Sequence, residues 1–428
     1  MRETRNSNRV AAVLLVTTAL CATGAGAAWA QQGRDGEPDP NITVQQRARP
    51  EFDPLGIRAG SFFFYPSIGL EGLYDSNIFA TDDDEEDDFA SILTPRLQVR
   101  SNFSRHSLSL DAGAETAFYL DENDNNYQDV FLRSAGRLEI TRDNLLDGNF
   151  TVSRVHEDRD SPDDTGVDEI TTYQNHALGL SYRRNFARLF GVVGGELRRF
   201  DFDDADDTNN DDRDRNQYLT RLRVGYEVSP RLAGFVEGTL DARRYDQTPD
   251  DLGIDRDSEG YSLRAGAEVD ITSIIFGEVS AGYSGRTYED DELDSVGGFS
   301  FSGAITWNVT PLTSIVFEGL GEIQETSVGA GDGTGDEATA NFQKSLSVDV
   351  THELLRNVLL NANAAYIRDD FEGIDRSDDS VLVGGGVSYL LNRNLSLDAT
   401  YSFRNRFSDE SDEEYTRNVL RVGVTAKL

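Results

Sequence analysis

The chain has 428 residues, with 77 acidic and 40 basic side chains, and its formal net charge is -37 at pH 7. A chain this acidic repels phosphate and gains nothing from releasing its counterions, which argues against nucleic acid as a partner. High acidity can also indicate disorder, but an aromatic content of 10% and a regular apolar alternation argue against that for most of the chain.

Residues 1–30 are predicted to be a signal peptide. Three arginines precede an apolar run at 10–22, and a small-residue cleavage motif ends at Ala30. The run is shorter than the roughly 20 apolar residues that a spanning helix needs. We therefore expect the mature protein to begin at Gln31, and removal of three arginines and one glutamate leaves a net charge of -39. The only cysteine, Cys21, lies in the removed segment, so no disulfide is expected.

Residues 31–60 contain four of the ten prolines, many polar residues and no apolar period. This composition predicts a flexible tether ahead of the folded domain. In an exported protein that is inserted into the outer membrane, the tether would lie in the periplasm. There it would either contact a partner or enter the domain that follows.

Residues 61–428 are predicted to form a single domain of strands. From Ser67 to Asp75 apolar and polar residues alternate with the period of two that is typical of a strand with one apolar face. The same pattern recurs in about eighteen segments: 62–80, 89–103, 106–120, 127–141, 145–158, 169–183, 188–203, 215–228, 232–246, 258–271, 274–289, 295–309, 313–327, 339–351, 357–371, 379–391, 395–408 and 414–428.

Short and long connections alternate along these segments. The short ones have tight-turn compositions, such as Thr310-Pro311-Leu312 and Asn392-Arg393-Asn394. Most of the others are longer and acidic, such as 81–88 and 204–214. Tight turns at one end and long loops at the other are typical of a transmembrane β-barrel.

The segments are also about 14 residues long, against the five or six that are usual in soluble sheets. In a soluble sandwich the apolar face would form a core, whereas in a barrel it would face lipid. The signal peptide, the loop asymmetry and the strand length favour the barrel. We therefore predict an all-β fold, a transmembrane antiparallel β-barrel of about 18 strands, with both termini in the periplasm.

The polar face of the predicted barrel carries charges of both signs. Two interpretations are compatible with each other: the charges pair across strands, or they line a hydrated path. Glu71, Glu318, Asp349 and Asp398 are among the acidic members of this face. The residues predicted to line the lumen are Arg96, Arg100, Arg137, Arg221, Arg223, Arg243, Arg264, Arg286, Glu115, Glu237, Asp241, Glu268 and Glu278.

Aromatic residues recur on the apolar face, and we interpret them as girdles at the two membrane interfaces. Stacking on sugar rings would be the alternative if they faced inward. The residues are Tyr74, Phe118, Tyr226, Tyr283, Trp307, Tyr366, Tyr389 and Tyr401.

The segment 49–58, with sequence Arg-Pro-Glu-Phe-Asp-Pro-Leu-Gly-Ile-Arg, precedes Gly60-Ser61-Phe62, Tyr65-Pro66-Ser67 and the motif Tyr-Asp-Ser-Asn-Ile-Phe at 74–79. These motifs resemble the opening segment of an outer-membrane β-barrel porin family of Gram-negative bacteria. The resemblance extends in architecture from Arg49 to the C terminus. It implies a pore associated with exopolysaccharide export. The chain departs from the usual aromatic last residue of such barrels, since it ends in Leu428.

No motif for covalent chemistry is found in the sequence, and no cofactor is expected. The pair Asn175-His176 near Tyr173 is the least unfavourable candidate for a hydrolase, but no nucleophile motif accompanies it. The acidic loops, including Gly331 to Asp336, could bind divalent cations. Their spacing matches no known loop motif, so solvated loops screened by counterions are the favoured interpretation.

The sequence therefore predicts a pore in the outer membrane of a Gram-negative bacterium that conducts polar solutes or a polymer. The alternatives are a general diffusion porin and a structural or adhesion barrel without an open channel. Expected partners are outer-membrane lipid and lipopolysaccharide, the barrel assembly machinery and periplasmic polysaccharide-export components.

Overall fold

The fold was analysed in a computed structural model that describes residues 42–164, 169–205, 208–251, 253–271, 274–328 and 338–428. The predicted signal peptide at 1–30 and the first part of the predicted tether lie outside these residues. The described strands are β1 (Ile57–Ala59), β2 (Phe62–Asp75), β3 (Asp88–Ser101), β4 (Ser107–Tyr119), β5 (Tyr127–Thr141), β6 (Asn144–His156), β7 (Thr172–Phe186), β8 (Leu189–Phe202), β9 (Arg215–Ser229), β10 (Leu232–Tyr245), β11 (Ser258–Ile271), β12 (Ile275–Tyr288), β13 (Val296–Thr310), β14 (Thr313–Gln324), β15 (Ala340–Leu355), β16 (Val358–Glu372), β17 (Arg376–Asn392), β18 (Leu395–Ser408) and β19 (Tyr415–Lys427).

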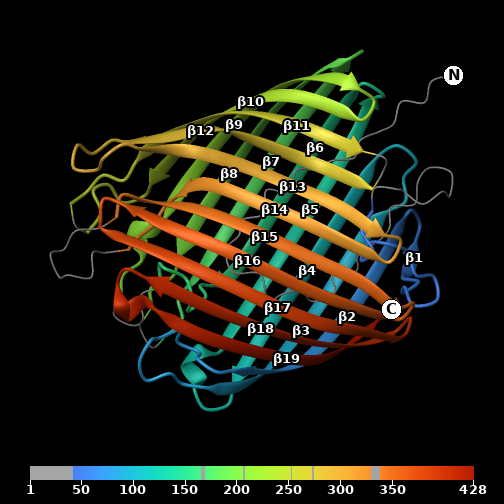
Figure 1. The fold of residues 1–428 in the computed structure, drawn as a ribbon, viewed down its shortest axis with the longest axis horizontal. Coiled ribbons are helices and arrows are strands. Elements are labelled where there is room, and N and C mark those ends of the chain that lie inside the picture. Colours follow the sequence, from blue (N-terminus) through green and yellow to red (C-terminus); the bar gives the residue numbers. More distant parts are fainter. Residues whose placement is uncertain (1–41, 165–168, 206–207, 252, 272–273, 329–337) are drawn as a thin grey trace.

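Strands β2 to β19 form a closed antiparallel barrel in which each strand pairs with the next in the chain (Figure 1). Closure is made by β19 and β2, whose register runs from Val419 opposite Asp75 to Lys427 opposite Ser67. The eighteen barrel strands and their order confirm the predicted fold. Within the described part of the chain, three single 3-10 turns are the helical elements, and no helix there is long and apolar enough to cross a membrane.

The two ends of the barrel differ as the sequence predicts. Two-residue turns join β7 to β8, β13 to β14 and β17 to β18, whereas the loops after β6 and β14 each span 15 residues. We call these the short-turn end and the long-loop end. The C terminus lies at the short-turn end (Figure 1). An exception is the link from β16 to β17, a three-residue turn at the long-loop end in which Gly373 has a φ of 97°.

Three predicted strands are too long by several residues. The first was expected to reach residue 80 but ends at Asp75, because the side chain of Asn77 bonds to the backbone of Thr81 and Thr416 and turns the chain. The strand predicted to start at 169 begins at Thr172, and the one predicted to end at 327 ends at Gln324. In both cases the extra residues belong to long loops that leave the wall.

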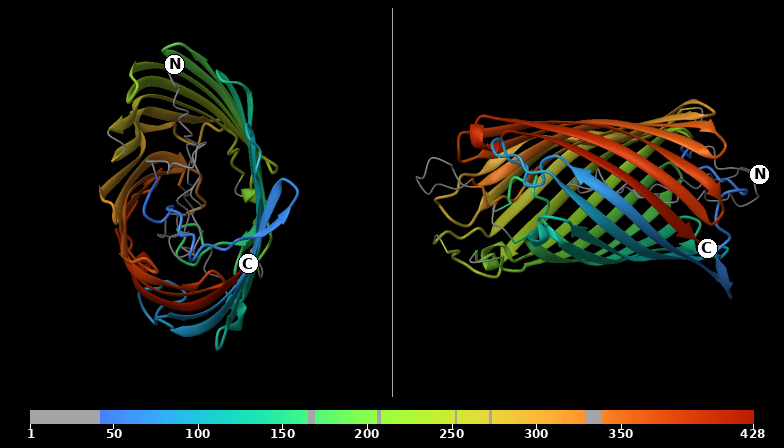
Figure 2. Two further views of the ribbon diagram at one scale, coloured as in Figure 1. Left: turned by 90° about the vertical axis from the view of Figure 1, so that its right-hand side faces the viewer. Right: turned by 90° about the horizontal axis from the view of Figure 1, so that it is seen from below.

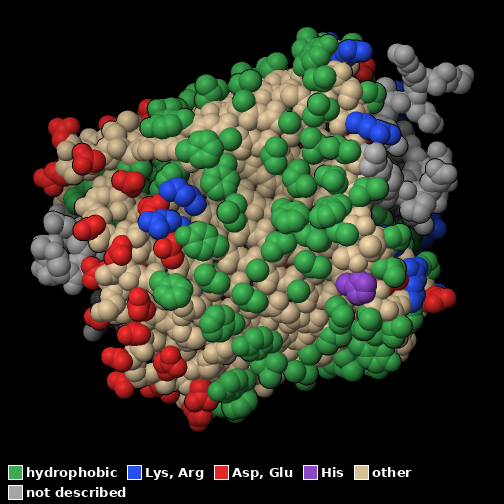
Figure 3. Space-filling model, in the orientation of Figure 1, with side chains coloured by type: hydrophobic (Ala, Val, Ile, Leu, Met, Phe, Trp, Pro, Cys, Tyr) green, Lys and Arg blue, Asp and Glu red, His purple; other side chains and the backbone are tan. Residues whose placement is uncertain are grey.

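The outer surface of the barrel is apolar over its middle, and acidic side chains gather at the long-loop end (Figure 3). Residues of the outward face are strongly exposed, for example Leu263 at 61%. Of the predicted girdle residues, Tyr74 is half-buried because its ring packs against Phe89 at a centroid distance of 4.8 Å. The other predicted girdle residues are exposed on this face: Phe118, Tyr226, Tyr283, Trp307, Tyr366, Tyr389 and Tyr401.

The view along the barrel shows an elongated cross-section with residues 42–56 lying across it (Figure 2). Beside these residues, β1 pairs with the start of β2, from Ile57 opposite Phe64 to Ala59 opposite Phe62, and the resulting hairpin projects beyond the wall. Strand β1 lies inside the segment predicted as a tether, and its three residues showed no strand pattern of their own.

Candidate functional site

The candidate site is the lumen face of the barrel. The inward side of the wall is identified by a contact inside the barrel, since Arg404 on β18 pairs with Asp160, which belongs to the loop after β6. Side chains alternate along each strand, and residues paired in register share a face, so the inward residues of every other strand follow from Arg404. All thirteen charged residues predicted to line the lumen lie on it: Arg96, Arg100, Arg137, Arg221, Arg223, Arg243, Arg264, Arg286, Glu115, Glu237, Asp241, Glu268 and Glu278. That they line a conducting path stays a prediction.

A charge network on β9 to β12 centres on Glu237, which is 2% exposed. Glu237 lies directly opposite Arg223 on one neighbouring strand and Arg264 on the other. Its carboxylate accepts hydrogen bonds from Arg223 Nε at 2.8 Å and from Arg264 Nη2 at 3.0 Å. Arg223 also binds both oxygens of Glu278, at 2.7 and 2.8 Å, in the bidentate geometry that suits a guanidinium and a carboxylate.

Aromatic rings pack against two arginines of this network. The guanidinium of Arg223 lies 3.9 Å from the ring centroid of Phe235, and that of Arg183 lies 4.0 Å from Phe190. Phe190 and Phe235 form a small buried cluster on the inward face. Stacking of this kind favours arginine over lysine. These arginines are therefore fixed in place rather than free to follow a passing ion.

A second network lies nearer the long-loop end. Arg286 pairs with Asp241 and donates to Ser258 Oγ at 2.7 Å. Arg243 pairs with Glu325, a carboxylate from the loop after β14, which also accepts from Tyr245 OH at 2.7 Å. The loop is thus fastened to the wall at β10.

Elsewhere on the lumen face, pairs join neighbouring strands. Arg96 pairs with Asp111, and Arg137 Nε donates to Asp147 at 2.5 Å. Glu115 accepts from Tyr127 OH at 2.8 Å. Of the two interpretations of the polar face, cross-strand pairing therefore holds for many of the predicted residues.

The loop after β6 extends into the lumen. Its Asp160 reaches β18 and β19, six and five strands away from β6 around the barrel, where the carboxylate pairs with Arg404 and lies 3.6 Å from Arg417 Nη1. Its Asp163 accepts from Thr326 Oγ1 at 2.6 Å and from the backbone N–H of Ser327 at 2.8 Å. The two 15-residue loops therefore contact each other as well as the wall, and together they narrow the long-loop end of the barrel.

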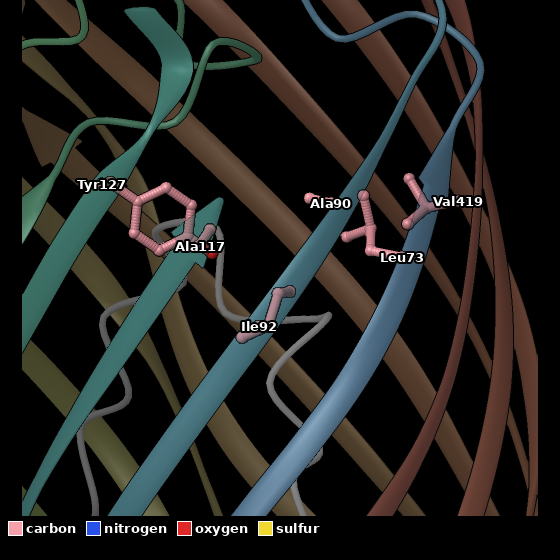
Figure 4. Close-up of a cluster of buried hydrophobic side chains, with 6 residues drawn as sticks. All are labelled: Leu73, Ala90, Ile92, Ala117, Tyr127 and Val419. Carbon is pink, nitrogen blue, oxygen red and sulfur yellow. The ribbon is translucent and has the colours of Figure 1, made fainter. Parts of the chain in front are cut away.

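An apolar cluster on the lumen wall supports this loop (Figure 4). Ile170, near the end of the loop, packs against the cluster and anchors the return of the chain to β7. Burial there removes apolar surface from water, which stabilises the inward position of the loop. The cluster is formed by Leu73, Ala90, Ile92, Ala117, Tyr127 and Val419.

Burial shifts the pKa of two carboxylates in the loops. Glu157 pairs with Arg213 at 2.8 Å, and burial raises its pKa against the effect of the arginine. Burial also raises the pKa of Asp214 to about 6, with a further contribution from the neighbouring Asp201. Both groups belong to loops at the long-loop end.

The chain before β1 is attached along the short-turn end. The backbone N–H of Val44 donates to Ser314 Oγ at 2.7 Å, and Arg49 Nη2 donates to Glu353 Oε2 at 2.9 Å. Arg393 donates to the carbonyl of Pro50 at 2.8 Å. Residues 42–50 thus contact the ends of β13 to β18, a set of contacts that the sequence pattern did not indicate.

Four inward carboxylates have a different environment from the networks. Glu71, Glu318, Asp349 and Asp398 are half-buried, and no ion pair or hydrogen bond joins them to another described residue. They lie on β2, β14, β15 and β18. Strands β13 and β14 contain no lysine or arginine that could pair with Glu318, whereas Arg421 interacts electrostatically with Glu71 and Lys427 with Asp398.

The hydrolase candidate receives no support from the geometry. Tyr173 and Asn175 lie on the inward face of β7, whereas His176 lies on the outward face beside the exposed Leu178. Among the residues that the structure describes, no group of three or more His, Cys, Asp and Glu side chains could hold a metal ion. The whole glycine-rich segment from Gly331 to Asp336 falls outside them.

The sequence did not single out the residues that hold the loops and the chain before β1, namely Arg49, Asp160, Glu353 and Arg417. One signal was available: loops longer than about 12 to 15 residues inside a compact domain are uncommon and are often functional. The loop after β6 meets that criterion. The partners of Asp160 and Asp163 had no local signal, because they are more than 160 residues away in the chain and Arg404 is 244 residues away.

Comparison with known proteins places this barrel among porins. The sequence matches the family described as "Putative beta-barrel porin 2" over residues 49–428. Solved structures similar to this chain include OpdL of Pseudomonas aeruginosa, with 11% identity, a TM-score of 0.42 and coverage of 86% of this chain and 100% of that one. A BenF-like porin from Pseudomonas fluorescens Pf-5 has 11% identity, a TM-score of 0.44 and coverage of 85% and 99%.

A third similar structure, the outer membrane protein opdK from Pseudomonas aeruginosa, has 12% identity, a TM-score of 0.43 and coverage of 85% and 99%. No curated protein sequence matches the chain. The family match covers the whole barrel and residues 49–56 before β1. The chain therefore belongs to the "Putative beta-barrel porin 2" family, and its fold is that of an outer-membrane porin.

Proposed function

We propose that the protein is a passive pore that lets small polar solutes cross the outer membrane, with the short-turn end and both termini in the periplasm. The observation that carries the proposal is a charged, hydrogen-bonding face turned inward in a closed barrel of eighteen strands. Barrels of about 16 to 18 strands are wide enough to leave an aqueous channel. A lumen of this composition remains hydrated and offers polar partners along the path.

The loop after β6 favours small solutes over wide ones. Asp160 is fixed to Arg404 on β18, six strands away from β6, and Asp163 bonds to the loop after β14, so the loop extends over the opening at the long-loop end. Uptake of small polar molecules fits such a narrowed opening. The outer-membrane lipid, lipopolysaccharide and the assembly machinery are the partners that this placement implies.

The test is planar-bilayer recording of the purified full-length mature protein. Stable conductance steps are expected. Absence of conductance in protein that shows the heat-dependent gel shift of a folded barrel would support the alternative of a structural or adhesion barrel. Turnover of lipid or glycan by the same preparation would instead support an enzyme.

Export of an extracellular polysaccharide, with periplasmic export components as partners, is a second proposal. It is supported by the hydroxyl and amide side chains on the inward faces of β15 and β16, such as Ser345, Ser347, Asn361 and Asn363. Groups of this kind hydrogen-bond to sugar hydroxyls. Deleting the gene and measuring secreted polysaccharide tests this proposal, and unchanged secretion would contradict it.

A further inference from the structure

The β1–β2 hairpin extends the sheet beyond the point where the barrel closes. Where the C-terminal strand closes on β2, the contact nearest the start of β2 is made by the backbone N–H of Leu428, which donates to the carbonyl of Pro66 at 3.1 Å. Before Pro66, the edge of β2 is covered by β1 instead, through the pairs of Ile57 with Phe64 and Ala59 with Phe62. Strand β1 therefore occupies the row that a longer β19 would have filled.

One side of this hairpin continues the lipid-facing surface. Phe62 and Phe64 share the face of Ile68 and Leu70, because the register of β2 with β3 runs without a bulge along the whole strand. Ile68 and Leu70 are 50% and 55% exposed on the outer surface of the barrel. Ile57 and Ala59 lie opposite Phe64 and Phe62, so they belong to the same face.

The opposite side of the hairpin has a different chemistry. Arg58 lies opposite Phe63, and its guanidinium is 5.7 Å from the centroid of that ring. On β3, Arg100 lies opposite Phe63 on the same side. The two faces of the hairpin thus differ, with isoleucine, alanine and phenylalanine outward and the stacked pair of Arg58 and Phe63 inward.

The apolar band of the barrel reaches the level of the hairpin. Large apolar residues are exposed immediately beside the short turns, for example Phe103 and Leu312 at 42% and 45%. The ring of Phe103 packs edge-on against Phe62, with centroids 5.4 Å apart. The lipid boundary at the short-turn end therefore runs beside the turns, and the hairpin projects from the wall at that boundary (Figure 2).

We propose that the outward face of the β1–β2 hairpin, with Ile57, Phe62 and Phe64, inserts into the headgroup region of the lipid leaflet at the short-turn end. The occupant of this face is phospholipid, because the face is continuous with the lipid-facing band of the barrel. Aromatic side chains favour this interfacial region, and arginine stems can reach from it toward phosphates. The hairpin would then fix the point from which residues 42–56 turn back across the opening.

The test uses tryptophan as a depth probe. In a Trp307→Phe background, which removes the only tryptophan beyond the signal peptide, Phe64→Trp places the probe on the outward face and Phe63→Trp on the inward face. Each variant is reconstituted in phosphatidylcholine vesicles with and without brominated acyl chains. A second pair, Ile57→Trp and Arg58→Trp, repeats the comparison on β1. Variants are compared only where the heat-dependent gel shift shows a folded barrel.

Bromolipid is expected to quench the outward probes at least about twofold more than the inward probes, with emission shifted to shorter wavelength. Equal quenching of both faces would overturn the proposal, as would outward probes that emit as in water. A short-wavelength emission that bromolipid does not change would assign the face to protein, such as a second copy of the chain, and would also overturn it. None of these outcomes bears on conductance, so the proposed pore is tested separately.

Discussion

Arg49 and Glu353 form a buried ion pair that joins the chain before β1 to the end of β15. Arg49 Nη2 lies 2.9 Å from Glu353 Oε2, and the two side chains are 4% and 6% exposed. The same arginine donates to the carbonyl of Val44 at 2.8 Å. Burial lowers the pKa of Arg49, and the adjacent carboxylate opposes that change. The pair is therefore stable as a unit and costly to leave half-formed.

Replacing one member of this pair is expected to release the segment. Arg49→Ala leaves the Glu353 carboxylate buried without its partner, which costs about 3 to 5 kcal/mol. Trypsin cleavage after Arg47 should then become at least about 100-fold faster, because about 1.4 kcal/mol corresponds to tenfold in local opening. Arg356→Ala is the comparison, because Arg356 is half-exposed, lies 3.5 Å from the same carboxylate and donates to the carbonyl of Ala48 at 3.3 Å, so a much smaller increase is expected. Equal cleavage rates in both variants would contradict the role of Arg49.

Arg223 is expected to be the most sensitive residue of the lumen network. Arg223→Lys keeps the charge but cannot bind both oxygens of Glu278 and also reach Glu237. Arg223→Ala should lower the free energy of unfolding by about 3 kcal/mol or more. Arg221→Ala, whose Nε is 3.8 Å from Glu237, should change it by about 1 kcal/mol or less. Urea titration of the folded band on gels measures both, and a similar loss in the two variants would be inconsistent with the network.

Asp160 is expected to control the width of the opening. Asp160→Ala removes the partner of Arg404 and the second carboxylate near Arg417, whose other partner is Asp75, and should loosen the loop from β18 and β19. We expect larger and noisier single-channel conductance, because the loop no longer extends over the opening. Asp83→Asn, in the exposed loop after β2, is the control and should leave conductance unchanged. If Asp160→Ala leaves conductance unchanged too, the loop does not limit the current.

The unpaired carboxylates of the lumen are expected to favour cations. Glu71, Glu318, Asp349 and Asp398 form no ion pair or hydrogen bond with a described residue, and only Glu71 and Asp398 have a cation, Arg421 and Lys427 respectively, near enough to interact electrostatically. Mobile cations are therefore expected to balance much of their charge. In a potassium chloride gradient the reversal potential should indicate cation preference. Neutralising all four to Gln or Asn should reduce that preference by about twofold or more. Neutralising Asp82, Asp83, Glu85 and Glu86 in an exposed loop is the matched control, and an equal effect there would locate selectivity at the loops.

Asp214 is expected to make the loop after β8 sensitive to pH. An unfolded aspartate titrates near pH 3.9, whereas burial raises the pKa of Asp214 to about 6 in the folded protein. Between about pH 3.9 and pH 6, Asp214 therefore holds a proton in the folded state that it has lost in the unfolded state. The free energy of unfolding decreases as pH rises through this window, because the folded state must then give up the proton. Asp214→Asn keeps a neutral acceptor for the Phe202 N–H at all pH values. The variant should lose its folded gel band at a higher temperature than the parent, with a difference that grows from about pH 5 to pH 7. A constant difference would contradict this assignment.

The strand framework could be predicted because each strand carries its own information. In β10, Glu237 and Asp241 alternate with Val236 and Leu240, and this local pattern gives both the strand and its inward side. The same argument indicated that β19 closes on β2, since an open edge cannot remain in lipid. Faces and strand order therefore followed from spacing alone.

The contacts across the lumen could not be predicted in the same way. Asp160 and Arg417 are separated by most of the barrel in sequence, and no period relates a loop residue to a distant strand. The attachment of Arg49 to Glu353 has the same character. Such contacts form only when closure of the barrel brings distant strands together at one end, so no local sequence pattern indicates them.

The register of Glu237 between Arg223 and Arg264 has a consequence for how the barrel assembles. A slip of one residue between β9 and β10 would turn Glu237 and Asp241 outward, since neighbouring side chains point to opposite faces. Arginine or lysine side chains that face lipid near the bilayer midplane cost about 2 to 4 kcal/mol each, and aspartate and glutamate cost somewhat less. A mispaired hairpin would therefore be rejected by the membrane itself before the barrel closed. The charges on the lumen face therefore also disfavour incorrect strand pairing during assembly.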